Sequence, residues 1–441
     1  MLWRQIVKGS RGSSTVSIGS EAHGADDLDF DLERLRARRN RKWTHFPGDG
    51  LPAWIADMDF RTAPPIQIAL QHLVADEDYG YPDRDGDTPD RAIATAFARH
   101  ERLLHGWDPN PDLVQPLPDL VQGMFTTVLA YTEPGDGVVL PFPAYPPFQE
   151  AINETDRRLL PIHMLNDGQR WRLDEEHLRN VARDARMIMV SNPHNPTGHV
   201  WKPAELQAIG GIALEYDLVI VSDEVHGLLT YPGYRYLPMA TVSPEVAAVT
   251  VTMNSATKAF NIAGARCAVL HFGSSNLHDR FRLRFPRRSL GAVSVFGVDS
   301  TLAAWTHGRP WLERIRAKLT ANRTRIATRL SESMPLIGYV EPEATYFAWL
   351  DLSAFDLHQP PSALLAAAGV ITSPGSDFGS DYRDFVRLNF ATSASLLEDM
   401  LSRIAEAVAP HSVDSRVASD RTVSPRTAIA SSRTCDESVQ C

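Results

Sequence analysis

Cysteine is scarce in this sequence, and no long apolar segment occurs. The 441 residues include only Cys267, Cys435 and Cys441, and no CxxC pair. Three thiols cannot build a disulfide framework, so we expect a protein of a reducing, cytoplasmic compartment without a cysteine-based zinc site. No apolar run approaches the roughly 18 residues needed to span a bilayer, so we expect no membrane partner.

Positive charge is also in deficit. Lys and Arg number 44 against 54 Asp and Glu, which gives a net charge of −10. This balance argues against a broad nucleic-acid surface, and we expect no nucleic-acid partner. The length and the apolar fraction of 43% are typical of a globular chain with two or three domains.

Lysine is the rare cation. Arginine cannot lose its proton in a protein, whereas lysine can act as a nucleophile or base. Lys258 stands in S-A-T-K, directly after an apolar run at 249–253. A lysine beside a buried strand end is costly unless it is paired, neutral or covalently bonded, and a Schiff base with an aldehyde cofactor meets that condition. A surface loop lysine is the alternative. The only other lysines are Lys8, Lys42, Lys202 and Lys318.

Familiar nucleotide and metal motifs are missing. The sequence has no G-x-G-x-x-G, no G-x-x-x-x-G-K-[ST] and no H-E-x-x-H. Dinucleotide, P-loop and zinc-protease hypotheses therefore lose their main support, and we expect no metal.

Apolar strands alternate with helical patterns through the middle of the chain. The predicted strands are 138–142, 187–190, 218–222, 249–253 and 268–272, with a helix at 203–216 among them. This alternation predicts an α/β protein with a largely parallel sheet covered on both faces. A long amphipathic helix at 309–330 leads into a smaller α+β unit with strands at 346–351 and 385–390 and helices at 361–368 and 394–408.

The chain divides into five expected segments. They are a disordered extension (1–27), an N-terminal segment joining the small domain (28–60), a large cofactor-binding domain (61–308), a small C-terminal domain (309–410) and a disordered tail (411–441).

Two polar residues follow predicted strands. Asp223 comes after the strand 218–222, at the carboxyl end where α/β sheets place ligands. Its carboxylate suits a protonated pyridine nitrogen, and a helix or turn cap is the alternative. Asn195 lies in the turn-rich S-N-P-H-N-P-T-G at 191–198. Its amide suits a phenolate oxygen, and an Asx-turn is the alternative. Ser255, Thr257 and Arg266 surround Lys258 in the sequence and suit a phosphate group.

These features form an ordered set. D-E-V-H begins at Asp223, 28 residues after Asn195; Lys258 of S-x-T-K follows 35 residues later; an R-L-N strand begins at Arg387. Over residues 28–410 the set resembles the fold-type I pyridoxal-phosphate enzymes of the class I/II aminotransferase group. W-I-A-D-M-D-F at 54–60, Y-G-Y at 79–81 and S-D-E-V-H at 222–226 are similar to the MalY/PatB branch of cystathionine β-lyases and related C–S lyases.

The resemblance implies a cofactor, pyridoxal 5′-phosphate, and a role for each matching residue. Lys258 forms the internal aldimine, Asp223 binds the pyridine nitrogen and Asn195 the ring 3-oxygen. Tyr145 stacks on the ring, and packing alone is its alternative. His226 contacts the ring oxygen or the substrate, and a structural histidine is an equal alternative.

Phosphate, substrate and partner contacts follow from the same resemblance. Backbone N–H groups near Gly123, Met124 and Phe125 hold the phosphate together with Ser255, Thr257 and Arg266. Arg387 clamps the α-carboxylate of an amino-acid substrate. Tyr81 reaches the phosphate region of a neighbouring subunit, which implies a homodimer. The large domain is expected to hold a mostly parallel seven-stranded sheet.

The expected reaction is β-elimination of cysteine S-conjugates, with L-cystathionine giving homocysteine, pyruvate and ammonia. An aminotransferase uses the same residues and is the alternative. A regulatory protein that binds a partner on the same fold is a further alternative. The motif spacing does not separate these, and only the branch resemblance favours the lyase.

Overall fold

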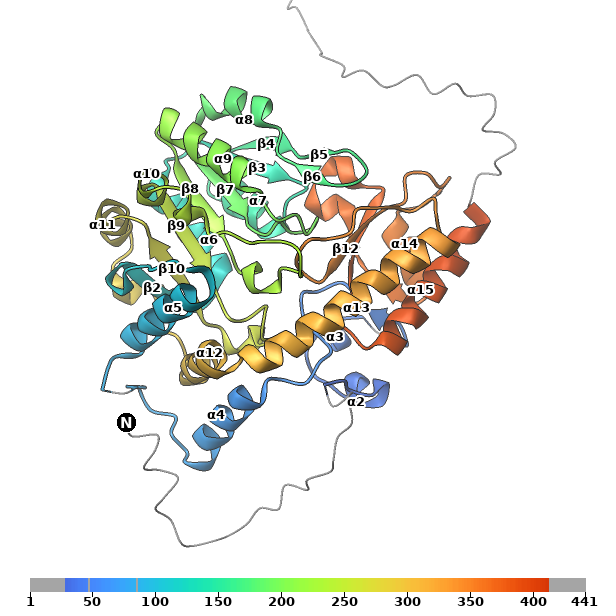
Figure 1. Cartoon of the computed structure of the whole chain (residues 1–441), viewed down its shortest axis with the longest axis horizontal. Coiled ribbons are helices and arrows are strands. Elements are labelled where there is room, and N and C mark those ends of the chain that lie inside the picture. The colour runs from blue at the N-terminus through green and yellow to red at the C-terminus, as the bar shows by residue number, and fades with distance from the viewer. Residues whose placement is uncertain (1–27, 47, 85, 412–441) are drawn as a thin grey trace, which may run out of the picture.

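A seven-stranded sheet forms the centre of the larger unit. The computed structural model describes residues 28–46, 48–84 and 86–411 (Figure 1). The strand order is β2-β10-β9-β8-β7-β3-β4, and β10 alone runs antiparallel to its neighbours. The expected mostly parallel α/β sheet is confirmed. The strands are β2 (Val114–Leu117), β3 (Gly137–Phe142), β4 (Arg158–His163), β7 (Ala185–Ser191), β8 (Val219–Asp223), β9 (Thr250–Asn254) and β10 (Ala268–Phe272).

Helices cover the sheet and bury most of its inner strands. Every residue of β3, β8 and β10 is buried, which explains their continuous apolar sequences. Helix α6 packs against α7 and α11, whereas α9 packs against α8 and α10. These helices are α6 (Leu120–Tyr131), α7 (Pro146–Asn153), α8 (Glu175–Ala182), α9 (Pro203–Glu215), α10 (Pro244–Ala248) and α11 (Ser275–Arg284).

Two strands of the seven-stranded sheet escaped the sequence prediction, and both are edge strands. β2 and β4 end the sheet on opposite sides. Each contains a proline, Pro116 in β2 and Pro161 in β4. Proline cannot donate to a ladder, and in β2 and β4 it interrupts an already short apolar run. The inner strand β3 also contains a proline, Pro141, but it follows three consecutive apolar residues, so that strand was still predicted.

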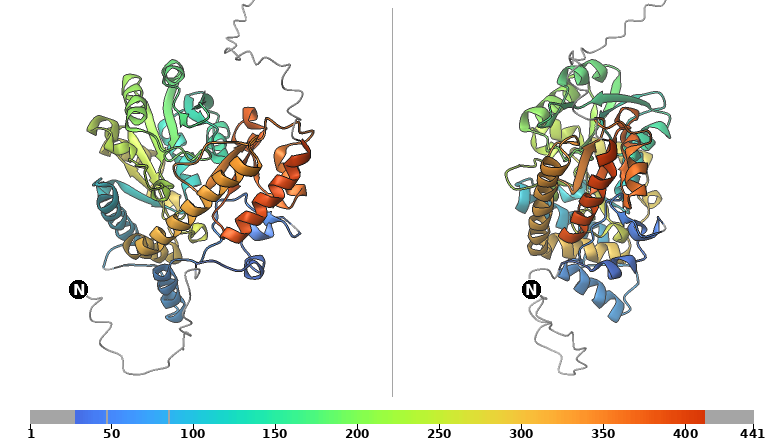
Figure 2. Two further views of the ribbon diagram at one scale, coloured as in Figure 1. Left: turned by 45° about the vertical axis from the view of Figure 1, so that its right-hand side comes forward. Right: turned by 90° about the vertical axis from the view of Figure 1, so that its right-hand side faces the viewer.

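Three further helices lie beside the sheet. They are α4 (Pro64–Ala75), α5 (Pro89–His105) and α12 (Val295–His307), and α12 contacts both α4 and α5. Helix α4 projects from the rest of the molecule in every view (Figures 1 and 2).

The smaller unit is built on a four-stranded antiparallel sheet in the order β11-β12-β15-β14. Its parts are α13 (Arg309–Ser333), β11 (Gly338–Tyr339), β12 (Phe347–Asp351), α14 (Pro361–Ala367), β14 (Ser373–Pro374), β15 (Phe385–Asn389) and α15 (Ala394–Val408). β1 (Leu51–Pro52) pairs in parallel with β13 (Val370–Ile371), so the N-terminal segment lies against this unit. The short helices α2 (Leu32–Arg36) and α3 (Arg41–Thr44) precede β1, and β5 (Leu165–Asn166) pairs with β6 (Trp171–Arg172). The five-segment division of the chain stays a prediction.

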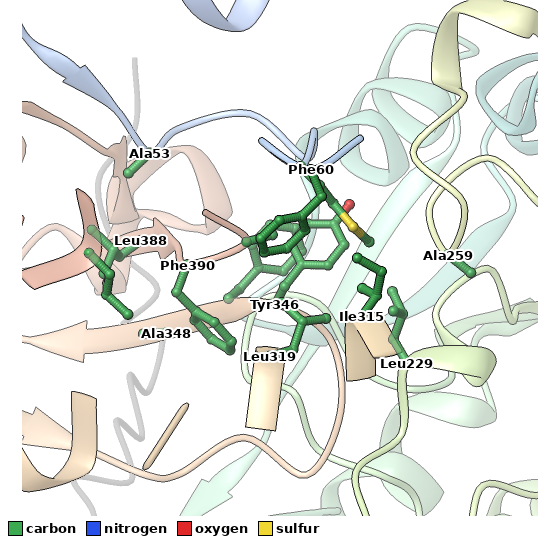
Figure 3. Close-up of a cluster of buried hydrophobic side chains, with 14 of the residues drawn as sticks. Ala53, Phe60, Leu229, Ala259, Ile315, Leu319, Tyr346, Ala348, Leu388 and Phe390 are labelled. Atoms are coloured by element: carbon green, nitrogen blue, oxygen red, sulfur yellow. The ribbon is translucent and has the colours of Figure 1, made fainter. Parts of the chain in front are cut away.

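One apolar core joins the two units (Figure 3). Ile315 and Leu319 of α13 lie between the small sheet and the larger unit, and Phe60 and Tyr346 pack nearby. Ala259, the neighbour of Lys258, is fully buried in this same core. The segment that carries the predicted catalytic lysine is therefore held by packing from both units.

The predicted disordered segments 1–27 and 411–441 lie, except for His411, outside the described residues. Within the described ranges, no helix combines the length and the apolarity that crossing a membrane requires.

Candidate active site

A cavity of about 140 Å³ opens at the carboxyl ends of β7 and β8. Polar side chains from several loops converge there, as expected for a doubly covered α/β sheet. Nine of the thirteen predicted site residues line it: Met124, Tyr145, Asn195, Asp223, His226, Ser255, Thr257, Lys258 and Arg266.

Lys258 lies in the loop after β9, and its Nζ donates to the backbone oxygen of Ala56 at 3.4 Å. Burial lowers the pKa of Lys258, and the Asp57 carboxylate opposes that shift more strongly than Asp223 does. A lysine with a lowered pKa is more often neutral and is therefore a better nucleophile and base.

Asp223 ends β8 and is buried, and its Oδ1 accepts a hydrogen bond from the Val225 N–H at 3.2 Å. Burial raises the pKa of Asp223 to about 7, and nearby Lys258 only partly offsets that. A cationic group beside this carboxylate would return it to the ionised form. A protonated pyridine nitrogen is such a group.

His226 faces the same cavity in a neutral form. Burial lowers its pKa to about 3, with Lys258 and Arg387 adding to the shift. The ring packs edge-on against Tyr346 and Phe347, with centroids 6.0 and 5.8 Å away. Its Nδ1 is buried and has no hydrogen-bond partner among the described residues, so the ring keeps one unused hydrogen-bonding atom.

Arg387 lies on β15 just behind the cavity. Its Nη1 donates to Asn195 Oδ1 at 3.0 Å, and its Nη2 donates to the Trp54 oxygen at 2.9 Å. Burial lowers the pKa of Arg387 to about 10, so the guanidinium stays charged at neutral pH. The ring of Phe347 lies 4.2 Å from its central carbon, which adds a cation–π contact. Arg387 does not itself line the cavity, but its partner Asn195 does.

The structure corrects the prediction of which backbone N–H groups would meet the phosphate. Asp119 caps α6, and the Gly123 N–H already donates to the Asp119 oxygen at 3.3 Å. From Gly123 onward the helix satisfies its own N–H groups, so Gly123, Met124 and Phe125 have none to offer. Leu120 and Val121, one turn earlier, both line the cavity. Asp before an apolar run is an N-cap signal, and it would have placed the helix start correctly.

The two hydroxyls near Lys258 are not equivalent. Ser255 Oγ donates to the Cys267 oxygen at 2.6 Å and lies 2.8 Å from Thr257 Oγ1. The Ser255 proton is therefore engaged within the protein, while Thr257 retains a hydroxyl proton to donate. Thr257 is the better placed of the two for an anionic ligand.

The two predicted aromatic residues lie in different surroundings. Tyr145 lines the cavity, where burial raises its pKa. Tyr81 does not line it and is fully exposed, with a relative accessibility of 105%. One copy of the chain therefore does not bring Tyr81 to the cavity.

The sequence prediction missed the role of the segment 54–58 as a wall of the site. Asn389 Nδ2 donates to the oxygens of Ile55 and Asp57 at 2.6 and 2.7 Å. The Tyr346 hydroxyl donates to the Ala56 oxygen at 3.0 Å, which places that oxygen between Tyr346 and Lys258. The W-I-A-D-M-D-F motif was visible in the sequence, but its partners Lys258, Tyr346 and Asn389 lie about 200 to 335 residues away.

A buried ion pair lies at the end of this wall. Lys42 Nζ lies 2.7 Å from Asp59 Oδ2, and both side chains are buried. Lys42 also donates to the Asp57 oxygen at 3.1 Å, and Trp43 Nε1 donates to Asp59 Oδ1 at 2.8 Å. Every polar atom of the pair therefore has a partner in the wall or beside it.

Among the residues that the structure describes, no group of three or more His, Cys, Asp or Glu side chains is arranged to hold a metal ion.

Comparison with known proteins identifies the family. The model of the class I and II aminotransferases matches residues 67–404. The cystathionine beta-lyase PatB of Bacillus subtilis (strain 168) is 32% identical over 364 residues, covering 82% of this chain and 93% of that protein. A cystathionine beta-lyase of Corynebacterium glutamicum is 34% identical over 383 residues, covering 85% and 98%. The structure of a PLP-bound C-S lyase from Staphylococcus hominis aligns with a TM-score of 0.80 at 25% identity, covering 87% and 98%. The resemblance drawn from the motifs is confirmed, and the chain belongs to the class I and II aminotransferase family.

Proposed function

We propose that this protein is a pyridoxal-phosphate-dependent C–S lyase that catalyses β-elimination of cysteine S-conjugates such as L-cystathionine. The observation that carries the proposal is the meeting of Lys258, Asp223 and Asn195 in one cavity. The names of the relatives, cystathionine beta-lyase and C-S lyase, support this reaction among those open to the family.

The residues present fit the cofactor. Burial raises the pKa of the Asp223 carboxyl, Lys258 only partly offsets this, and the ring nitrogen would be a stronger cationic partner. Asn195 Oδ1 accepts from Arg387, so its amide N–H₂ is left to donate to the ring 3-oxygen. The N-terminus of α6 with Thr257 and Arg266 would hold the phosphate, and Tyr145 would cover the ring.

Each residue has a distinct chemical task. Pyridoxal phosphate, when bound, supplies an aldehyde that condenses with amines and a ring that accepts electrons from Cα. Lys258 would hold the aldehyde carbon at rest and then take the proton from the substrate Cα, a task that its lowered pKa suits. Arg387 would bind the substrate α-carboxylate. Loss of the Cα proton and cleavage of the Cβ–S bond release the thiol, and water converts the remainder to pyruvate and ammonia.

The reaction is tested by pyruvate release from L-cystathionine with the cofactor-loaded protein and no keto acid. We expect pyruvate and homocysteine in equal amounts. Conversion that requires a keto acid and yields no pyruvate would show an aminotransferase instead. A regulatory role through partner binding stays a prediction, and it would show as partner affinity retained in a Lys258→Ala protein.

We further propose a homodimer in which Tyr81 completes the site of the neighbouring subunit. Tyr81 is fully exposed, and Ile68 and Val74 on the projecting helix α4 are 49% and 56% exposed (Figure 2). Apolar side chains gathered on a projecting element favour contact with a second copy. Mixed dimers of Lys258→Ala and Tyr81→Phe subunits should regain activity that neither variant has alone. Sedimentation as a monomer would contradict the proposal.

A cytoplasmic location is part of the proposal. It is supported by the scarcity of cysteine and by Cys267, which is buried and free. Fractionation of cells expressing the full chain tests it, and recovery in the soluble cytoplasmic fraction is expected.

A further inference from the structure

The phosphate end of the cavity contains a carboxylate. Asp119 Oδ1 accepts from the Gln122 N–H at 2.8 Å as the N-cap of α6. Its Oδ2 forms an ion pair with Arg266 Nη2, and both residues line the cavity. One side chain therefore engages both the helix N-terminus and the cation predicted to hold the phosphate.

A phosphate group and this carboxylate would compete for the same partners. Free N–H groups and the helix dipole draw anions to the start of α6. Asp119 already supplies a negative charge there, and it already neutralises the Arg266 guanidinium. A phosphate placed beside Leu120 and Val121 would therefore meet like-charge repulsion as well as attraction.

Two further observations concern Arg266 and Asp119. Arg266 has φ of +55°, a left-handed conformation that residues with a side chain rarely adopt. Such backbone geometry is often retained where it aims a functional side chain. The charge of Asp119 is also among the causes that raise the pKa of Tyr145, which lines the same cavity.

We infer that Asp119 weakens binding of the cofactor's phosphate group by competing for Arg266 and the α6 N-terminus. The inference rests on the proposed function. Because binding is weaker, the fraction of the protein that holds the cofactor depends more strongly on the free cofactor concentration than it would without the Asp119 carboxylate. The ligand chemistry concerned is that of any phosphate monoester or of inorganic phosphate.

The test compares Asp119→Asn with the unchanged protein. Asn is as good an N-cap as Asp, so the substitution removes the charge and keeps the helix start. We expect the cofactor-free variant to bind pyridoxal phosphate about three- to tenfold more tightly in equilibrium dialysis, as expected for one partly exposed charge pair. Asp119→Ser, which also caps, should behave alike, and Arg266→Gln should bind more weakly. The gain should shrink as salt rises.

Inorganic phosphate separates this inference from the proposed function. The affinity for inorganic phosphate is measured in Lys258→Ala, with and without Asp119→Asn. This affinity reports on the phosphate contacts of Arg266 and the α6 N-terminus, without any bond to the lysine. Tighter phosphate binding in the Asn variant supports the inference, even where pyridoxal phosphate fails to bind and the proposed function falls. Equal or weaker binding of both phosphate and cofactor overturns it, since Asp119 would then position Arg266 for the ligand.

Discussion

Arg387 Nη1 donates to Asn195 Oδ1 across 3.0 Å, and this hydrogen bond joins two motifs that lie 192 residues apart. Arg387 comes from the small sheet and Asn195 from the loop after β7. The bond fixes the orientation of the Asn195 amide and holds the guanidinium at the back of the cavity. The proposed substrate clamp and the proposed contact to the ring oxygen are therefore one unit.

Arg387→Lys should raise KM for the amino-acid substrate about 10- to 100-fold with a smaller change in kcat. Lysine keeps the charge but loses the planar fork that reaches Asn195, the Trp54 oxygen and a carboxylate together. Steady-state kinetics measure the split. Arg403→Lys is the matched control, since Arg403 pairs with Asp399 away from the cavity and should leave KM unchanged. An unchanged KM in Arg387→Lys would remove Arg387 from the substrate site.

Lys258→Ala should abolish the visible absorbance of the covalently bound cofactor and lower turnover about 10³-fold or more. Lys258→Arg is the more specific test, because arginine keeps the positive charge but cannot form a bond with an aldehyde. Both are expected to fold, since Lys258 donates only one long hydrogen bond, at 3.4 Å. Near-normal turnover in either variant would overturn the assignment of the site.

The contribution of Asp223 to the stability of the cofactor-free protein should fall as pH rises. Its pKa lies at about 7 in the folded state against 3.8 for the free group, so the folded state binds the proton more tightly. The stabilisation that the protonated Asp223 gives the folded state is complete below about pH 4 and is lost as pH rises through 7. Asp223→Asn should therefore be more stable than the unchanged protein at pH 8, by up to about 4 kcal/mol, and equally stable near pH 4.

Urea unfolding at pH 4, 6 and 8 measures this difference. Glu224, whose pKa burial also raises to about 7, contributes a pH dependence of the same sign in both proteins. Buried histidines with a lowered pKa, such as His194 and His226, contribute one of the opposite sign in both, so the difference between the two proteins is the quantity to compare. Exposed Glu332→Gln serves as the control and should not change the profile. Equal pH profiles of Asp223→Asn and the unchanged protein would contradict the prediction.

Lys42→Met should destabilise the protein by about 3–5 kcal/mol, since it leaves Asp59 buried without its cation. Denaturant unfolding gives the value, and Lys42→Met combined with Asp59→Leu should recover part of it. Lys202→Met is the comparison, because the Lys202–Glu343 pair is more exposed and should contribute less than about 1 kcal/mol. If Lys42→Met and Lys202→Met lowered the free energy of unfolding by similar amounts, burial would not be what makes the Lys42–Asp59 pair important for stability.

The inner strands and the reactive residues could be predicted because their signals are local. Continuous apolar runs marked β3, β7, β8, β9 and β10 to within about two residues. Asp223 is the last residue of β8, and Lys258 follows β9 within a few residues, so finding the strand located the side chain. In the edge strands β2 and β4, polar residues and proline leave at most two apolar residues in a row, so the same signal was absent.

The sequence by itself determined the alternating α/β pattern, the order of the motifs and the lysine at the strand end, because each depends on residues close together in the chain. Only the tertiary structure decided which N–H groups of α6 face the cavity, how 54–58 forms its wall, and that Asp119 engages Arg266. These features depend on contacts between segments about 150 to 330 residues apart. Such contacts exist only after the sheet has formed and the two units have packed on their shared core, and no local pattern encodes them.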